Sequence, residues 1–189
     1  MPIELDETVY PVPLPIRRVE WTRIKRKLFT AAQCDELVRF AETKGRYYRS
    51  ASKRIRRDVE ICYAGAQDFP WAFEALAATF ATENVWGFAL TSIVEQLRIQ
   101  RYSRGGYTRG HMDYDYASTD QSKITAIVPL VRKTSWEGGD FLLRGKNIRT
   151  APDRGDCLLF PSFAWHGVSP VTKGVRIVLS AWVAGPRLV

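Results

Sequence analysis

The second half of the chain alternates short apolar segments with glycine-marked turns. Such segments, rich in β-branched and aromatic residues, predict strands at Ser92–Tyr102, Lys123–Val131, Asp140–Arg144, Asn147–Thr150, Asp156–Phe160 and Val175–Ala184. Turn sequences such as Gly105-Gly106 and Gly138-Gly139 lie between them. Close-set short strands with regular turns are typical of a β-sandwich or a closed barrel. This half therefore predicts a mainly β core.

Two amphipathic helices are expected before the β core. Thr30 and Gln33 form a capping-box pattern at the start of the first helix, and Gly45 is a natural stop. The second helix should begin near Asp68 and Pro70. Apolar residues repeat at helical spacing at Cys34, Leu37, Val38 and Ala41, and again at Phe73, Leu76, Ala77 and Phe80. Between the helices, Arg56–Ala64 predicts a strand, and the helices should cover one face of a sheet.

The length of 189 residues suits one domain with a sizeable core. We expect residues 1–91 to supply the helices and supporting strands, and residues 92–185 to carry the functional site. No apolar run approaches the roughly 20 residues of a membrane span, and the first residues do not resemble a signal peptide. Three widely spaced cysteines without a CxxC pattern predict buried free thiols in a reducing compartment. A cytoplasmic location without a membrane partner is therefore expected.

The net charge of +8 is concentrated in residues 17–27 and 44–57. The favoured interpretation is a solvated basic surface. A basic rim that attracts an acidic substrate comes second, and a nucleic-acid surface comes third because no nucleic-acid-binding module is recognisable. Within the second cluster, Arg54, Arg56 and Arg57 could contact a substrate, although a solvated strand edge is favoured.

Two histidines, His111 and His166, are the only ones in the chain. Asp113 follows His111 by two positions, so in an extended segment both side chains point the same way. His166 must then reach the same point from another strand. Two imidazoles and one carboxylate form the facial triad that holds non-haem Fe(II) and leaves coordination positions open. An isolated HxD pattern is weak, so the flanking sequence has to support this hypothesis.

Arg176 lies ten residues after His166, in an apolar strand. Because side chains alternate along a strand, Val178, Ser180 and Trp182 share its face. Arg176 can face a pocket only if these residues line the pocket too. A guanidinium grips a carboxylate through two parallel hydrogen bonds, and without an anionic partner its burial would be costly. Arg176 therefore predicts an acidic co-substrate.

These motifs together resemble the 2-oxoglutarate/Fe(II)-dependent dioxygenases of the prolyl-4-hydroxylase-like group. The matching residues, in chain order, are Arg101-Tyr102, Gly105, Tyr107, His111-x-Asp113, Gly138-Gly139-x-Phe141, Gly155-Asp156, Phe160-Pro161-Ser162, His166 and Arg176. They extend over Ile93 to Gly185, about half of the chain. The resemblance implies a double-stranded β-helix, the jelly-roll fold of cupins, preceded by N-terminal helices.

The resemblance also implies roles for single residues. Fe(II) would be held by His111, Asp113 and His166. The co-substrate 2-oxoglutarate would chelate the iron, and its distal carboxylate would pair with Arg176, helped by the Tyr102 hydroxyl. A plain packing role is an almost equal alternative for Tyr102. O2 is the further co-substrate, and ascorbate is a candidate reductant.

The implied reaction is hydroxylation of an unactivated C–H bond, with release of succinate and CO2. The favoured substrate is an amino-acid side chain, prolyl-like, in a peptide or protein or as a small molecule. Collagen-type enzymes usually carry lysine in place of Arg176, which weakens the inference to proline. Asp113 favours hydroxylation over halogenation, because halogenases have Gly or Ala there. Candidate substrate contacts are Tyr114, Asp115 and Trp182, although Trp182 could equally anchor the barrel.

Other functions remain open at this level. The same chemistry could oxidise a nucleobase or another small molecule. A cupin-like metalloenzyme that does not use 2-oxoglutarate is a second alternative, against which Arg176 argues. A binding module that has lost its metal is a third, against which the complete triad argues. The sequence predicts no oligomeric state.

Overall fold

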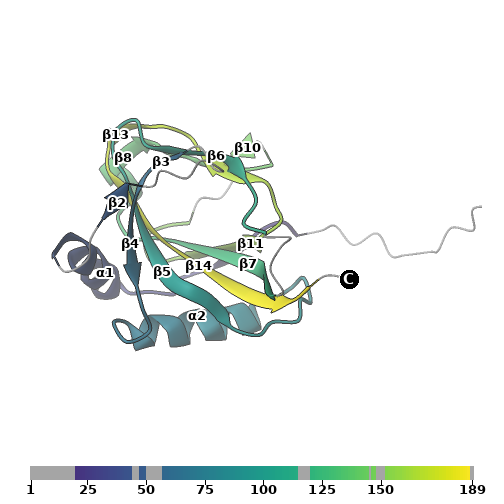
Figure 1. Ribbon diagram of the computed structural model, residues 1–189. Coiled ribbons are helices and arrows are strands. Elements are labelled where there is room, and N and C mark those ends of the chain that lie inside the picture. The colour runs from purple at the N-terminus through teal and green to yellow at the C-terminus, as the bar shows by residue number, and fades with distance from the viewer. Residues whose placement is uncertain are drawn as a thin grey trace, which may run out of the picture.

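Two antiparallel β-sheets face each other in the computed structural model, and two helices cover the outer face of the larger sheet (Figure 1). The structure describes residues 20–43, 47–49, 57–114, 120–144, 146–147 and 152–187. Within these ranges the larger sheet has seven strands and the smaller has five. The predicted mainly β fold, a double-stranded β-helix preceded by helices, is confirmed.

The larger sheet has the order β1-β11-β7-β14-β5-β4-β2. Its strands are β1 (Arg23–Lys25), β2 (Tyr48–Arg49), β4 (Glu60–Ala64), β5 (Ile93–Tyr102), β7 (Asp120–Pro129), β11 (Cys157–Pro161) and β14 (Arg176–Pro186). The long strand β14 lies between β5 and β7, with Arg176 opposite Tyr102 and Trp182 opposite Thr125. The strand β14 is thus paired on both sides.

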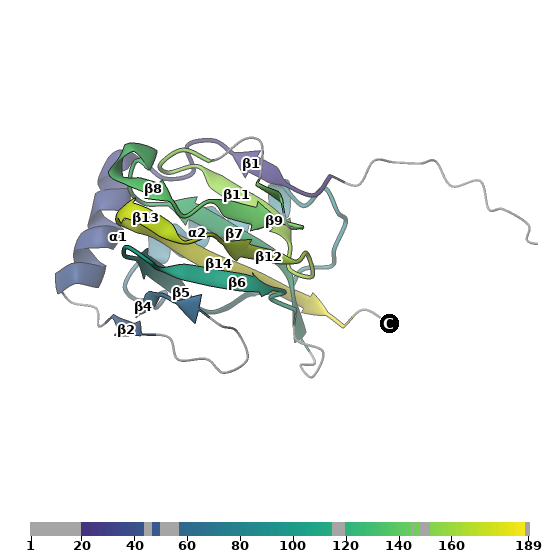
Figure 2. The same cartoon turned by 90° about the horizontal axis from the view of Figure 1, so that it is seen from above.

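The smaller sheet has the order β10-β9-β12-β6-β3 and lies in front of the larger one in Figure 2. Its strands are β3 (Arg57–Asp58), β6 (Tyr107–His111), β9 (Phe141–Leu143), β10 (Lys146–Asn147) and β12 (His166–Val168). A further pair consists of β8 (Trp136–Gly138) and β13 (Val171–Gly174), next to the 3-10 helix η1 (Lys133–Ser135).

The prediction of one continuous strand over Arg56–Ala64 is wrong in one respect. Its described part divides at Val59 into β3, which pairs with β6 of the smaller sheet, and β4, which pairs with β5 of the larger one. A change of sheet within one extended segment is how strands close the corner of a barrel. The alternation of side chains in the sequence could not reveal this change of sheet, because β3 and β4 are both extended.

The remaining predicted strands are found with shifted ends. The strand predicted to begin at Lys123 begins at Asp120, and of Asn147–Thr150 only Asn147 lies within the described residues, in β10. The sequence analysis gave no strand range for β1, β2, β6, β8, β12 or β13, which have two to five residues each. So few residues cannot display a periodic pattern.

The two helices are α1 (Ala31–Thr43) and α2 (Pro70–Thr82). The predicted capping box is present: the Thr30 amide donates to Gln33 Oε1 at 2.9 Å, and the Gln33 amide donates to Thr30 Oγ1 at 3.3 Å. Gly45, the predicted stop, lies outside the described residues. No helix in the described part of the chain is long and apolar enough to cross a membrane.

The faces of β14 belong to different layers of the molecule. Its outer residues Ile177, Leu179 and Ala181 join the core between the large sheet and the helices. Val178, from the inner face, joins a second core between the two sheets. The inner face of β14 therefore faces the interior of the barrel.

The three cysteines are free and buried, as predicted.

Candidate metal centre

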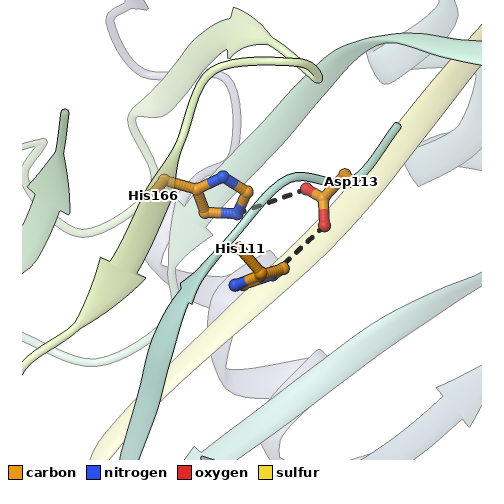
Figure 3. Close-up of side chains that lie close together, drawn as sticks. All are labelled: His111, Asp113 and His166. Carbon is orange, nitrogen blue, oxygen red and sulfur yellow. Dashed lines mark ion pairs between the residues drawn. The ribbon is translucent and has the colours of Figure 1, made fainter. Parts of the chain in front are cut away.

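Three predicted ligands meet between the sheets. His111 is the last residue of β6, His166 is the first residue of β12, and these neighbouring strands place the two histidines directly opposite each other. Asp113 follows β6 and completes the group (Figure 3). One donor atom from each residue lies within 4.8 Å of the other two. The structure thus brings together residues that are up to 55 positions apart in the sequence.

Both imidazole rings present Nε2 to the carboxylate. His111 Nε2 lies 3.3 Å from Asp113 Oδ1, and His166 Nε2 lies 3.3 Å from Asp113 Oδ2 (Figure 3). The opposite ring nitrogens are bound to the backbone: Nδ1 of His111 lies 2.9 Å from the Arg109 carbonyl, and Nδ1 of His166 lies 2.9 Å from the Ala164 carbonyl. A hydrogen bond from Nδ1 to a carbonyl leaves the lone pair of a neutral imidazole on Nε2, where a metal can bind.

Asp113 is oriented by its own set of hydrogen bonds. Its amide donates to the Ser162 carbonyl at 2.9 Å, and its Oδ2 accepts from Thr125 Oγ1 at 2.9 Å. Thr125 Oγ1 and Ser162 Oγ are also 2.9 Å apart, and the Trp182 side chain hydrogen-bonds the carboxylate. Sequence reasoning missed Thr125. The FPS segment containing Ser162 was part of the motif, but nothing in it indicated this supporting role.

The pKa shifts at the three residues reflect their closeness. Burial alone would raise the pKa of Asp113, but His166, His111 and Trp182 outweigh it and hold the pKa well below its usual range. Burial lowers the pKa of His166, which Asp113 only partly offsets. At His111 burial also lowers the pKa, but the Asp113 hydrogen bond and charge leave it raised. The ionised carboxylate that metal binding requires is therefore favoured.

The donor set fits a non-haem iron. Metal bonds of about 2.1 Å at right angles would place neighbouring donor atoms about 3 Å apart. The two Nε2-to-carboxylate distances of 3.3 Å are close to that value. Two imidazoles and one carboxylate are the ligands of the facial triad, which suits Fe(II) rather than a structural zinc site with four protein ligands.

Arg176 lies in the same pocket and is 5% exposed. Its guanidinium carbon is 5.1 Å from the centre of the Tyr102 ring, and burial lowers its pKa, which Tyr102 partly offsets. Its buried Nη1 has no hydrogen-bond partner among the residues that the structure describes. Since a guanidinium stays protonated in proteins, this donor is suited to an anion.

Gly139, from the predicted glycine pair, leaves room for Arg176. Its φ of 57° lies in the left-handed region, which favours glycine. A β-carbon there would also lie 2.8 Å from Val171 Cγ2 and 3.1 Å from Arg176 Cδ. The tight approach explains why the turn before β9 contains glycine.

The pocket is lined by the inner faces of both sheets. Arg176, Val178, Ser180 and Trp182 all contribute to it, together with the three predicted ligands. Side-chain alternation along the strand required that Arg176 could face a pocket only if Val178, Ser180 and Trp182 lined it too, and the structure meets this condition. The Tyr102 hydroxyl, also in the pocket, lies 3.1 Å from Thr108 Oγ1.

Comparison with known proteins agrees with this geometry. The model of the 2OG-Fe(II) oxygenase superfamily matches residues 97–184, which contain the three predicted ligands and Arg176. Over this segment the chain is similar to the 2OG-Fe(II) oxygenase superfamily. The resemblance found in the sequence is thereby confirmed, including its prolyl hydroxylase-like type.

Proteins similar to this chain include PKHD-type hydroxylases. That of Idiomarina loihiensis is 32% identical over 92 residues, which cover 48% of this chain and 42% of the relative. That of Parvibaculum lavamentivorans is 31% identical over 131 residues, which cover 62% and 58%. The chain spans about half the length of the curated relatives it matches.

Solved structures share the fold at lower sequence identity. The viral collagen prolyl hydroxylase of Paramecium Bursaria Chlorella virus-1, in its 2OG complex, has a TM-score of 0.71 at 18% identity. The match covers 88% of this chain and 97% of the viral one. A Pseudomonas putida prolyl-4-hydroxylase has a TM-score of 0.65 at 17% identity, with coverages of 89% and 95%. These similarities establish the fold of the chain.

The candidate substrate residues do not all lie in the pocket. Trp182 does, below the guanidinium of Arg98, whose carbon is 4.5 Å from the ring centre. Tyr114 is buried, and its hydroxyl donates to Gln121 instead. The described lining of the pocket does not include Tyr114, and Asp115 lies outside the described residues. Substrate contact by these residues stays a prediction.

Arg57 differs from the favoured expectation of a solvated strand edge. It does lie in the edge strand β3, but it lines the pocket together with Arg98. The reason is that β3 pairs with β6, with Arg57 opposite Thr108, so that this edge borders the pocket. The sequence could not reveal that Arg57 lines the pocket, because the change of sheet at Val59 was not predicted.

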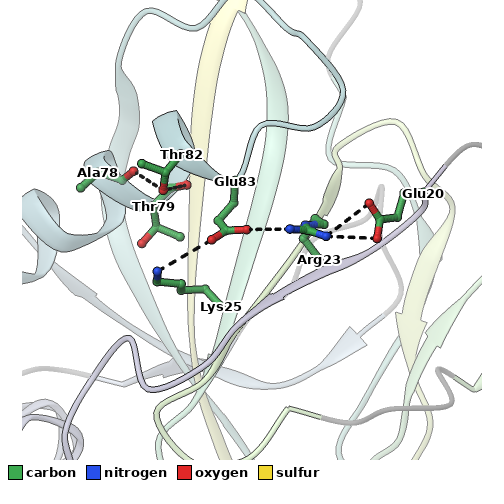
Figure 4. Close-up of polar contacts among 7 residues, drawn as sticks. All are labelled: Glu20, Arg23, Lys25, Ala78, Thr79, Thr82 and Glu83. Atoms are coloured by element: carbon green, nitrogen blue, oxygen red, sulfur yellow. Dashed lines mark hydrogen bonds and ion pairs between the residues drawn. The ribbon is translucent and has the colours of Figure 1, made fainter.

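Ion pairs engage three basic residues in the described part of the first basic cluster. Arg23 contacts Glu20 and Glu83 at 3.3 Å each, and Lys25 lies 3.8 Å from Glu83 (Figure 4). Arg26 pairs with Asp156. These ion pairs connect β1 to the end of α2 and to the turn before β11. The positive charge in this part of the cluster therefore stabilises the fold. They add no support to the nucleic-acid alternative.

Proposed function

We propose that this chain is an Fe(II)- and 2-oxoglutarate-dependent dioxygenase that hydroxylates an unactivated C–H bond. The single observation that carries the proposal is the shared pocket. It contains a two-histidine, one-carboxylate donor set and a buried arginine with an unpartnered N–H. A cupin-like metalloenzyme without 2-oxoglutarate would have no use for that arginine, whose burial is costly without an anion.

In this proposal His111, Asp113 and His166 hold Fe(II), with Thr125 fixing the direction of the carboxylate. Arg176 binds the distal carboxylate of 2-oxoglutarate, and the Tyr102 hydroxyl assists it. When bound, iron and 2-oxoglutarate supply the oxidising chemistry: one atom of O2 enters the substrate C–H bond and the other enters succinate, with release of CO2. The apolar side chains around the pocket, such as Ile127 and Phe141, exclude water from it.

The proposed substrate is an amino-acid side chain, with proline as the first to test. The relatives are named PKHD-type hydroxylases, and one similar structure is a Trichoplax adhaerens prolyl hydroxylase in complex with a hypoxia inducible factor peptide fragment. Whether the residue is free or within a peptide or protein is part of the test. Ascorbate as reductant, a single domain over residues 1–189 and a cytoplasmic location stay predictions.

The test measures succinate formed from 2-oxoglutarate with Fe(II), O2 and a panel of proline-containing peptides and free amino acids. We expect His166→Ala to lose bound iron and at least about a thousandfold in rate, because two ligands do not replace three. Met112→Leu is the matched control, since Met112 stands between two ligands but its side chain is exposed. If the His166→Ala protein retained iron and succinate formation, the triad assignment would be wrong.

A further inference from the structure

A second pocket adjoins the candidate iron pocket. It has a volume of about 120 Å³ and shares Ile127, Phe141 and Arg176 with the iron pocket. The rest of its lining comes from β8 and its surroundings and from neighbouring strands, and includes Pro129, Lys133, Trp136, Asp140 and Leu158. Arg176 therefore reaches both pockets.

Trp136 contributes a buried indole N–H to the second pocket. The residue is 7% exposed, and its Nε1 has no hydrogen-bond partner among the residues that the structure describes. Nη1 of Arg176 is in the same state. Indole and guanidinium nitrogens are donors only, so neither side chain can satisfy the other. Burial of a donor without an acceptor costs free energy, which a ligand with an acceptor can offset.

The Trp136 indole and the Arg176 side chain lie against the same glycine. A β-carbon at Gly139 would lie 3.1 Å from Arg176 Cδ and 3.5 Å from Trp136 Cδ1. Cδ1 is the indole carbon that is bonded to Nε1, so the N–H edge of the ring is the edge next to Gly139. Arg176 and this edge of Trp136 therefore approach the same point of the pocket lining.

The chain itself holds the ring of Trp136 but does not use its N–H. The ammonium of Lys133 lies 4.9 Å from the ring centre and donates to the Gly138 carbonyl at 3.1 Å. Asp140 is the only acidic residue in the described lining of this pocket, and it pairs with Lys133 at 3.5 Å. It does not accept from Trp136 Nε1 or Arg176 Nη1. An acceptor for these two donors therefore has to come from a ligand.

We propose that Trp136 is a further binding residue for 2-oxoglutarate, whose distal carboxylate accepts from the Trp136 indole N–H as well as from Arg176. This inference rests on the proposed function, because it concerns the co-substrate of the same site. A carboxylate accepts about four hydrogen bonds, so Arg176 and the Tyr102 hydroxyl leave a place for the indole. A 2-oxo acid without the distal carboxylate would leave the indole N–H unpaired, so Trp136 selects against it.

The first experiment observes the indole N–H by nuclear magnetic resonance. The protein is labelled with nitrogen-15 and loaded with Zn(II) in place of Fe(II), because Zn(II) has no unpaired electrons. The indole resonance of Trp136 is assigned through its connection to the backbone and followed as 2-oxoglutarate or 2-oxopentanoate is added. In 2-oxopentanoate a methyl group replaces the distal carboxylate. We expect the proton resonance to move downfield with 2-oxoglutarate alone, because a hydrogen bond to a carboxylate deshields the proton.

The second experiment removes the N–H and keeps an aromatic ring. In isothermal titration of the metal-loaded protein without O2, Trp136→Phe should bind 2-oxoglutarate about tenfold more weakly than wild type and bind 2-oxopentanoate equally well. A purely structural role of Trp136 would weaken the binding of both compounds alike. Trp71→Phe is the matched control, because Trp71 lies in α2 against Phe29 and outside the described lining of both pockets.

Wild type is titrated with 2-oxoglutarate first, and a lack of binding there contradicts the proposed function itself. Where wild type binds, two outcomes overturn the inference about Trp136. One is an indole resonance that stays in place with 2-oxoglutarate or moves equally with 2-oxopentanoate. The other is a Trp136→Phe protein that binds 2-oxoglutarate as tightly as wild type, or loses the same affinity for both compounds. If this variant does not fold, the resonance of wild type decides alone.

Discussion

Asp156, before β11, and Arg176, at the start of β14, are charged and almost equally buried, with 4% and 5% of their surfaces exposed. Around Asp156 the chain itself supplies the partners. Its carboxylate accepts from the amides of Lys27 at 2.9 Å and Asp153 at 3.0 Å, and from the guanidinium of Arg26. Around Arg176 the chain leaves Nη1 without a hydrogen-bond partner among the described residues.

The difference separates a structural charge from a binding charge. A buried charge with all its partners inside the chain contributes to the stability of the fold. A buried charge with an unmet donor is a cost to the fold that a ligand can offset. Both residues belong to the matching motif of the family resemblance, so the motif alone does not distinguish these two roles. The environment of each residue does.

Of the two residues compared, Arg176 should show the larger effect when it is replaced, and this effect should be on ligand binding. In Arg176→Met a side chain of similar length keeps the packing but loses the donors, so we expect roughly a hundredfold weaker binding of 2-oxoglutarate, about 3 kcal/mol. Isothermal titration of the metal-loaded protein without O2 measures it. An unchanged dissociation constant would remove Arg176 from the co-substrate site.

Replacement of Asp156 should reduce stability instead. Asp156→Asn loses charged hydrogen bonds in a buried place, so the free energy of unfolding should fall by about 2 kcal/mol at pH 7. Asp153→Asn is the control, because the Asp153 side chain is mostly exposed. Denaturant unfolding followed by circular dichroism measures both variants.

The same variant should alter the pH dependence of stability. Burial raises the pKa of Asp156, but the Lys27 amide and Arg26 outweigh it and lower the pKa below its model-compound value of 3.8. A carboxyl with a lowered pKa in the folded state stabilises the fold above its unfolded pKa, and the effect is lost as the pH falls through the folded pKa. The difference between wild type and Asp156→Asn should therefore shrink below about pH 4. A constant difference down to pH 2 would contradict this assignment.

Arg176→Met should change the free energy of unfolding less than Asp156→Asn does when both are measured without ligand. Replacing a buried charge by an apolar side chain of similar size is often neutral or stabilising, so its unfolding free energy should stay within about 1 kcal/mol of wild type. Addition of 2-oxoglutarate should then stabilise wild type but not the variant. A loss of 2 kcal/mol or more without ligand would make Arg176 a structural residue like Asp156.

The sequence predicted the layers of the fold better than their connections. Helical spacing at Leu37 and Leu76 and alternation along β14 are strong signals, because a whole face of each element is buried. The change of sheet at Val59 gives no such signal, since β3 and β4 are both extended. Strands of two or three residues are set by their neighbours in the sheet and not by their own composition.

At the candidate site, the residues within motifs were predicted and those between motifs were not. His111, Asp113, His166 and Arg176 were selected by spacing, and the structure brings all four to one pocket. Arg98 lies in a predicted strand, but nothing local shows that it stacks on Trp182, 84 residues later. Partners that come from distant strands can be identified only when the register of the sheet is known.

Replacement of Tyr102 should have the smallest effect on ligand binding. It also distinguishes the two roles that the sequence left open for this residue, which are assistance to Arg176 and packing. If its hydroxyl assists Arg176 in binding 2-oxoglutarate, Tyr102→Phe should weaken binding about fivefold, near 1 kcal/mol, while the ring keeps its place against the guanidinium. Tyr107→Phe is the control, because Tyr107 lies in β6 and not among the described residues that line the pocket. If Tyr102→Phe binds 2-oxoglutarate as wild type does but unfolds more easily, then the hydroxyl serves the fold through Thr108, 3.1 Å away, and Arg176 binds the distal carboxylate without it.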